Sequence, residues 1–141
     1  MKQLDSLEVQ VLVCSVDSQF VHMSWEEHEL KKLMPNGVPY PMLADPGGKV
    51  GRAYDVFDDE ANVNFRGRFI IDPDGIVQSA EVLTPPVGRN VPEMVRQLRG
   101  FAKVRETGGS EVCPAGWKEG KETLKPSAAL VGKVADTWKQ D

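Results

Sequence analysis

Apolar and polar positions change along the chain in patterns that predict strands and helices in turn. Residues 9–16 are almost wholly apolar and rich in β-branched side chains, which is typical of a strand buried on both faces of a mostly parallel sheet. Ser24 is expected to cap a helix over residues 25–34, because glutamates occupy its first turn and lysines its last. The short apolar segment 40–43 predicts a second parallel strand.

The middle of the chain carries a stronger pattern. Residues 65–72 and 76–83 predict an antiparallel hairpin, because the Pro-Asp-Gly turn sequence at 73–75 separates them. Residues 49–56 predict a short helix before it, and residues 91–105 a longer one after it. In that longer helix the apolar side chains recur at helical spacing on one face: Val91, Met94, Val95, Leu98, Phe101 and Ala102.

The order of these elements predicts the fold class. Strands that alternate with helices and close with a hairpin and a helix favour an α/β domain of thioredoxin type. We expect this domain to span residues 1–107. Residues 108–141 are expected to form a C-terminal tail, because a segment rich in Lys, Gly and Pro cannot build a core of its own. Such a tail has to lie on this domain or on a partner.

Composition and charge narrow the function classes. The 141 residues have a net charge of −4, so no basic stripe favours nucleic acid. No apolar run approaches the length of a membrane span, and the first residues do not have the pattern of a signal peptide. We therefore expect a cytoplasmic protein that uses neither nucleic acid nor membrane as a partner.

Metal and nucleotide sites are not expected. His22 and His28 lack metal-ligand spacing and no cysteine joins them. The acidic residues 58–60 lack the alternating ligands of a calcium loop and predict a solvated turn. The glycines at 47 and 48 lack a phosphate-binding pattern. No cofactor is therefore expected.

The two cysteines differ in their surroundings. Cys14 lies inside the first predicted strand, where a small hydrophobic role fits best. Cys113 lies in a predicted loop, beside Pro114 and close to Trp117 and Lys118. That setting favours a reachable thiol, although a buried and inert cysteine remains the alternative on residues alone.

Several motifs occur together in one order: S-V-D-S at 15–18, L-A-D-P at 43–46, N-F-R-G at 64–67, F-I-I-D at 69–72, P-V-G-R at 86–89 and E-V-C-P-A-G-W-K at 111–118. Together they resemble the typical two-cysteine peroxiredoxins of the AhpC/TSA (thiol-specific antioxidant) family, and the tail is similar to that of the AhpC-type alkyl hydroperoxide reductases. The resemblance implies a thioredoxin-like fold and reduction of hydrogen peroxide and organic hydroperoxides.

The resemblance also implies roles for three residues. Cys113 matches the resolving cysteine, which attacks the oxidised peroxidatic cysteine of a partner subunit. Arg66 matches the arginine that lowers the pKa of the peroxidatic thiol, and Arg89 a second arginine near it. On residues alone, both arginines could instead form ordinary salt bridges. The implied partners are a homodimer or higher oligomer and a thioredoxin-like or flavoprotein disulfide reductant.

The sequence departs from the family pattern at the peroxidatic motif, P-x-x-x-T-x-x-C-P. Cys14 does not match it, because neither the preceding Pro and Thr nor the following Pro is present. We expect the chain to correspond to the C-terminal two thirds of a peroxiredoxin and to have little or no activity alone. A further hypothesis is that the peroxidatic residue is selenocysteine, whose UGA codon was taken as a stop.

Two expectations follow from this departure. We expect the family to place a further strand between the strands at 9–16 and 40–43. In its absence these strands should pair directly, recruit a strand from another chain, or fold poorly.

The alternative function is a non-catalytic dimerisation or interaction module, and a weaker one is a thiol–disulfide carrier that uses Cys14 and Cys113.

Overall fold

The structure is a computed structural model that describes residues 2–138. It divides into two compact units, Met1–Arg89 and Asn90–Asp141. The last long helix therefore shares a unit with the tail. Among the described residues, no helix combines the length and the apolar character that crossing a bilayer requires.

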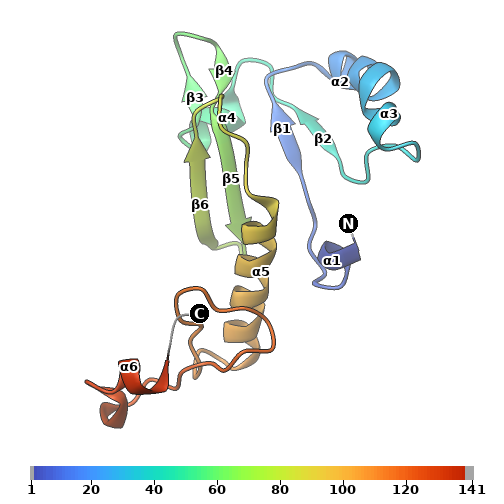
Figure 1. Ribbon diagram of the computed structural model, residues 1–141. Helices are drawn as coiled ribbons and strands as arrows, with labels where there is room; N and C mark the ends of the chain where they lie inside the picture. The colour runs from blue at the N-terminus through green and yellow to red at the C-terminus, as the bar shows by residue number, and fades with distance from the viewer. Residues whose placement is uncertain (1, 139–141) are drawn as a thin grey trace. The chain divides into compact units, whose positions relative to one another are not determined.

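The first unit begins with a parallel strand pair (Figure 1). Strand β1 (Val13–Ser15) lies beside β2 (Met42–Ala44). The predicted parallel pair is confirmed, but β1 is shorter than expected and its residues are half-buried. Residues before it turn back on helix α1 (Lys2–Asp5), because the backbone N–H of Val9 donates to the carbonyl of Leu4 at 3.0 Å. This N–H group of Val9 is therefore not free to extend the ladder.

A helical stretch follows β1 in three consecutive segments: α2 (Gln19–Trp25), the π-helical η1 (Glu26–Leu30) and α3 (Lys31–Leu33). Its N-cap is Ser18, whose hydroxyl accepts from the backbone N–H of Val21 at 3.3 Å. The prediction that Ser24 caps the helix is wrong, because Ser24 lies within it. The acidic and basic residues that suggested the two ends instead pair along the helix, as Glu27 does with Lys31.

A short helix and a small hairpin connect the two main strand pairs. Helix α4 (Lys49–Ala53) is followed by β3 (Phe57–Asp58), which pairs antiparallel with β4 (Val63–Asn64). The predicted acidic turn lies between these strands. There the Asp58 carboxylate accepts from the backbone N–H groups of Glu60 and Ala61 at 2.9 and 3.0 Å. The acidic cluster therefore caps a turn, as expected.

The long hairpin is confirmed. Strand β5 (Arg66–Ile71) pairs antiparallel with β6 (Val77–Leu83). Asp72 makes the turn, because its carboxylate accepts from the backbone N–H groups of Asp74 and Ile76, both at 2.9 Å. Like the β1–β2 pair, the hairpin is a two-stranded sheet of its own.

The pairing of β1 with β2 settles what happens to those two strands. Their register runs from Val13 opposite Met42 to Ser15 opposite Ala44, so the two strands are direct neighbours. Of the three expected outcomes, direct pairing is the one that the structure has. In the described part of the chain, the sheet edges that lack a strand partner are therefore the outer edges of each strand pair. No gap lies between β1 and β2.

The second unit is built on one helix. Helix α5 (Val91–Glu106) matches the predicted helix and begins at Asn90, whose side chain accepts from the backbone N–H of Glu93 at 3.0 Å. The tail after it contains two short helices, η2 (Ala128–Leu130) and α6 (Val134–Thr137). Trp117 of the tail is only 3% exposed. As expected, the first part of the tail lies on another element, which is α5.

Candidate functional site

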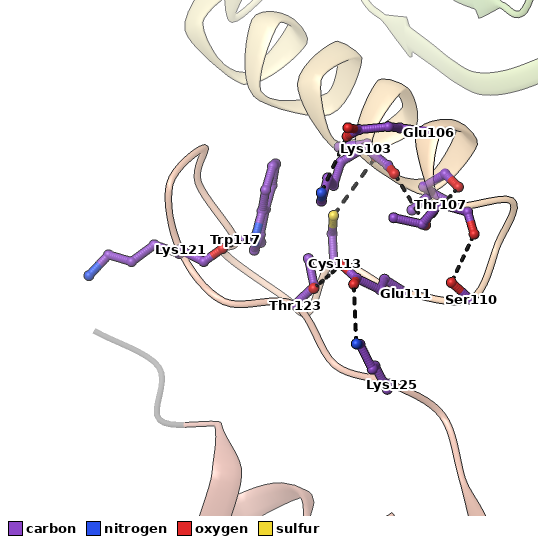
Figure 2. Close-up of polar contacts among 12 residues, drawn as sticks. Lys103, Glu106, Thr107, Ser110, Glu111, Cys113, Trp117, Lys121, Thr123 and Lys125 are labelled. Carbon is purple, nitrogen blue, oxygen red and sulfur yellow. Dashed lines mark hydrogen bonds and ion pairs between the residues drawn. The ribbon is translucent and has the colours of Figure 1, made fainter.

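Cys113 lies in a loop that is closed on itself. Val112 and Leu124 form an antiparallel bridge with hydrogen bonds of 2.9 and 3.0 Å. Next to this bridge the hydroxyl of Thr123 donates to the carboxylate of Glu111 (Figure 2). Cys113 lies within the loop that these contacts close, outside any helix or strand. The predicted loop is therefore present, and it is ordered by its own contacts.

The thiol faces helix α5. The Cys113 Sγ donates to the carbonyl oxygen of Gly100 at 3.8 Å, a long and weak sulfur hydrogen bond (Figure 2). A Cβ added at Gly100 would lie 3.9 Å from this sulfur and 4.0 Å from the Trp117 ring. Both side chains therefore pack around this one position of the helix. The cysteine is half-buried and forms no disulfide.

The charged groups around the Cys113 thiol shift its pKa in opposite directions. Burial raises the pKa of Cys113 above the ordinary value, and the Glu111 carboxylate raises it further. The guanidinium of Arg96 and the ammonium of Lys103 lower the pKa, because a nearby positive charge favours the thiolate. Burial prevails, so the thiol is the main form near neutral pH, and the two cations limit this effect.

Arg96 is the more firmly held of the two cations. Its Nε and Nη2 donate to both carboxylate oxygens of Glu93, at 2.7 and 2.8 Å. Its Nη1 donates to the carbonyl oxygen of Trp117 at 3.1 Å. The sequence reasoning missed Arg96. The available signal was the i, i+3 spacing of Glu93 and Arg96 on a predicted helix.

Trp117 anchors the loop on α5. Its indole N–H donates to the carbonyl of Lys121 at 3.0 Å, and its backbone N–H donates to the carbonyl of Pro114, also at 3.0 Å. An ion pair between Arg99 and Glu119 at 3.1 Å adds a second tie to the helix. The loop that carries the thiol is therefore fixed by one buried aromatic side chain and by polar contacts around it.

The two predicted arginines lie together at the start of β5. The Nε of Arg66 donates to the carbonyl of Pro85 at 2.6 Å, and Nη2 of Arg89 donates to the carbonyl of Gly67 at 3.2 Å. Burial lowers the pKa of Arg89, and the charges of Arg66 and Arg68 lower it further. Guanidinium groups keep their proton under such shifts. The result is a cluster of fixed positive charge.

Arg68 completes this cluster and was missed in the sequence reasoning. It stands opposite Glu81 in the hairpin register and pairs with it at 3.2 Å. Its side chain is only 8% exposed. The signal was its i, i+2 spacing from Arg66, which places both on the same face of a strand.

The candidate residues thus form two groups. Arg66 and Arg89 belong to the first unit, and Cys113 belongs to the second. One group offers positive charge for an anion, and the other offers a thiol. Within the described residues no set of three or more His, Cys, Asp or Glu side chains could hold a metal ion.

Cys14 has a different environment. It is half-buried in β1, opposite Leu43. Burial raises the pKa of its thiol, and the nearby Asp45 raises it further. In the described part of the chain, no cation opposes these effects in the way that Arg96 and Lys103 do at Cys113. These surroundings fit a small hydrophobic residue of the strand better than a nucleophile.

Solved structures define the class of the protein. The chain superposes on the reduced 2-Cys peroxiredoxin of Plasmodium vivax with a TM-score of 0.81 and 31% identity, over 93% of this chain and 68% of that one. It superposes on AhpC of Enterococcus faecalis with a TM-score of 0.72 and 35% identity, over 80% and 65% of the two chains. The fold is therefore the thioredoxin-like α/β fold of peroxiredoxins, as the motifs implied.

Sequence comparisons give the family. Residues 1–80 match the AhpC/TSA family, and residues 103–139 match the C-terminal domain of 1-Cys peroxiredoxin. The chain is 57% identical to selenocysteine-containing peroxiredoxin PrxU of Peptoclostridium acidaminophilum, over 96% of this chain and 67% of that protein. It is 41% identical to alkyl hydroperoxide reductase C of Bacillus subtilis, over 93% and 68%. The chain belongs to the AhpC/TSA family and spans about two thirds of the length of these relatives.

Proposed function

We propose that this chain takes part in thiol-dependent reduction of hydroperoxides and that Cys113 is the resolving cysteine. The observation that carries the proposal is the free, half-buried Cys113 thiol, held on α5 within the motif E-V-C-P-A-G-W-K. A resolving cysteine has to be reachable by another chalcogen, and a half-buried loop position meets that need.

The proposed step is an exchange at the oxidised peroxidatic residue. Reduction of the hydroperoxide leaves that residue as a sulfenic or selenenic acid. The Cys113 thiolate attacks its sulfur or selenium, a disulfide or selenenyl sulfide forms, and hydroxide leaves and is protonated to water. A thioredoxin-like or flavoprotein reductant then supplies the two electrons that restore both groups. The homodimer or higher oligomer of the family brings the two chains together.

The arginine cluster supports the peroxide step. Arg66 and Arg89 are held by backbone carbonyl groups at 2.6 and 3.2 Å, so their charges are fixed in place. Fixed guanidinium groups favour a deprotonated peroxidatic residue and stabilise the negative charge that develops on the leaving oxygen. We propose this role for both residues.

The peroxidatic residue itself has no match in these 141 residues, because the P-x-x-x-T-x-x-C-P motif does not occur in them. The similarity to a peroxiredoxin that contains selenocysteine supports the hypothesis that selenocysteine takes this role. Free thiols at Cys14 and Cys113 fit the reducing cytoplasm in which we place the protein.

A trapping experiment tests the resolving role. The chain is mixed with an alkyl hydroperoxide reductase C whose own resolving cysteine is changed to serine, and hydrogen peroxide is added in equimolar amount. We expect a mixed disulfide through Cys113, identified by peptide mass spectrometry. The Cys14→Ser variant should form it and the Cys113→Ser variant should not.

A parallel assay measures peroxide consumption with dithiothreitol. The chain alone should show little or no turnover. A stable complex with the partner but no disulfide and no turnover would refute the resolving role and favour the non-catalytic interaction module.

A further inference from the structure

We propose that Arg96 is the positioning residue for Cys113: its guanidinium, fixed by Glu93 and by the carbonyl of Trp117, holds a positive charge near the sulfur and stabilises the thiolate. The inference rests on the proposed role of Cys113 as a nucleophile. It adds a residue that no motif in the chain singles out, and it concerns how the thiol is activated.

The geometry leaves Arg96 little freedom. Two of its nitrogens bind the Glu93 carboxylate in bidentate fashion, and the third binds the Trp117 carbonyl at 3.1 Å. Bidentate pairs of this kind fix the plane of the guanidinium. Trp117 is 3% exposed, and its ring and the Cys113 sulfur both lie against Gly100, so Arg96 is bound to the residue that packs beside the thiol.

The other charges near the thiol are less suited to this role. Lys103 also favours the thiolate, but its ammonium lies 3.2 Å from the carboxylate of Glu106 on an exposed face, and its flexible stem fixes it less firmly. Glu111 acts against the thiolate and is itself bonded to Thr123 and paired with Lys125 at 3.7 Å. Arg96 is therefore the cation with a fixed position.

The thiol needs such a partner. Burial disfavours the charged form of a cysteine, and only the thiolate attacks an oxidised chalcogen. Arg96 cannot act as a base, because a guanidinium does not release its proton near neutral pH. Its contribution is electrostatic: it opposes the effect of burial while the loop keeps the sulfur half-covered.

The test measures the reactivity of Cys113 in the full chain, in a Cys14→Ser background. Alkylation by iodoacetamide, an uncharged reagent, is followed as a function of pH. We expect Arg96→Gln to slow alkylation near neutral pH by about threefold or more and to move the midpoint of the pH profile upward. Arg96→Lys should recover part of the rate, because it restores the charge without the bidentate contact.

Arg99→Gln is the matched control. Arg99 lies on the same helix and ties the same loop through Glu119, but it is not one of the charges that shift the pKa of the thiol. Its variant should keep the pH midpoint of the parent chain. In a background with Trp25 and Trp138 changed to phenylalanine, emission of the buried Trp117 shows whether each variant keeps the loop folded.

Salt dependence keeps the test decisive even if Arg96→Gln loosens the loop. In a Lys103→Gln variant, where Arg96 is the cation left to favour the thiolate, added salt should still slow alkylation near neutral pH, because it screens that charge. An unchanged pH midpoint in a folded Arg96→Gln variant, or a salt-independent rate in the Lys103→Gln variant, would overturn the proposal. A shifted midpoint without a mixed disulfide in the trapping experiment would instead refute the resolving role alone.

Discussion

Arg89 donates a hydrogen bond to the carbonyl oxygen of Gly67 at 3.2 Å, and this contact brings a third guanidinium to the strand that already carries Arg66 and Arg68. Three positive charges at one place repel one another. Glu81 is the acidic group that opposes this repulsion, since it pairs with Arg68 at 3.2 Å and favours the charged form of Arg89. The Glu81 carboxylate on β6 therefore offsets part of the repulsion within the cluster.

Removal of that carboxylate should destabilise the first unit. We expect Glu81→Gln to lower the free energy of unfolding by about 1–2 kcal/mol, less than for a fully buried pair because Glu81 remains partly exposed. Urea unfolding followed by circular dichroism measures this change. Replacement of Arg68 and Glu81 together by leucine should cost less than Glu81→Gln alone, and a larger loss in the double variant would contradict the argument.

Truncation of the buried indole should release the loop that carries the thiol. Trp117→Ala removes an aromatic side chain that is only 3% exposed and should cost about 3 kcal/mol. Trp117→Phe keeps most of the packing but loses the hydrogen bond to the Lys121 carbonyl, so about 1 kcal/mol is expected. Thermal unfolding measures both. Equal losses would show that packing at this position matters less than the hydrogen bond.

The two cysteines should differ in reactivity. Near neutral pH, alkylation should occur at Cys113 before Cys14, because cations oppose the raised pKa of Cys113 whereas Asp45 adds to that of Cys14. Peptide mass spectrometry after a short exposure to iodoacetamide identifies the modified site. In urea the preference should disappear, since it depends on the folded surroundings. A faster reaction at Cys14 in the folded chain would reverse the proposed assignment.

The local elements of the fold could be predicted from the sequence, because their causes are local. The hairpin turn depends on Asp72 and its neighbours, and α5 depends on Asn90 and one apolar face. The start of the earlier helix was mispredicted because Ser18 and Ser24 both satisfy the rule for an N-cap. Glutamates after Ser24 resembled a first turn, whereas the structure places them within the helix.

The residues of the candidate site also fall into those that the sequence singles out and those that it does not. Motifs carry Cys113, Arg66 and Arg89, so the roles proposed for them come from the resemblance to the family. No motif carries Arg96, because the role proposed for it depends on a contact with Trp117, which is 21 positions further along the chain. No periodicity in the sequence predicts which carbonyl a long side chain will reach after the tail has folded back onto the helix.

Acid should weaken the start of α4. Asp45 is 5% exposed, and its carboxylate accepts from the backbone N–H groups of Val50 and Gly51 at 2.8 and 2.9 Å. The bond from Gly51 is the main cause of a lowered pKa for Asp45, and the bond from Val50 adds to it. A lowered carboxyl pKa means that folding favours the charged form. This stabilisation is therefore present above the ordinary pKa of aspartate and is lost as the pH falls through the lowered one.

The Asp45→Asn variant tests this sign. Near pH 7 it should lower the melting temperature by about 3–6 °C, because an amide caps the helix without the charge. The difference between the two chains should shrink as the pH falls through the lowered pKa of Asp45, where the parent carboxylate takes up its proton. Asp58→Asn is the matched control, since that carboxylate also accepts from two backbone N–H groups but does so in an exposed turn. A difference at Asp45 that stays constant with pH would show that hydrogen bonding alone, and not the charge, stabilises α4.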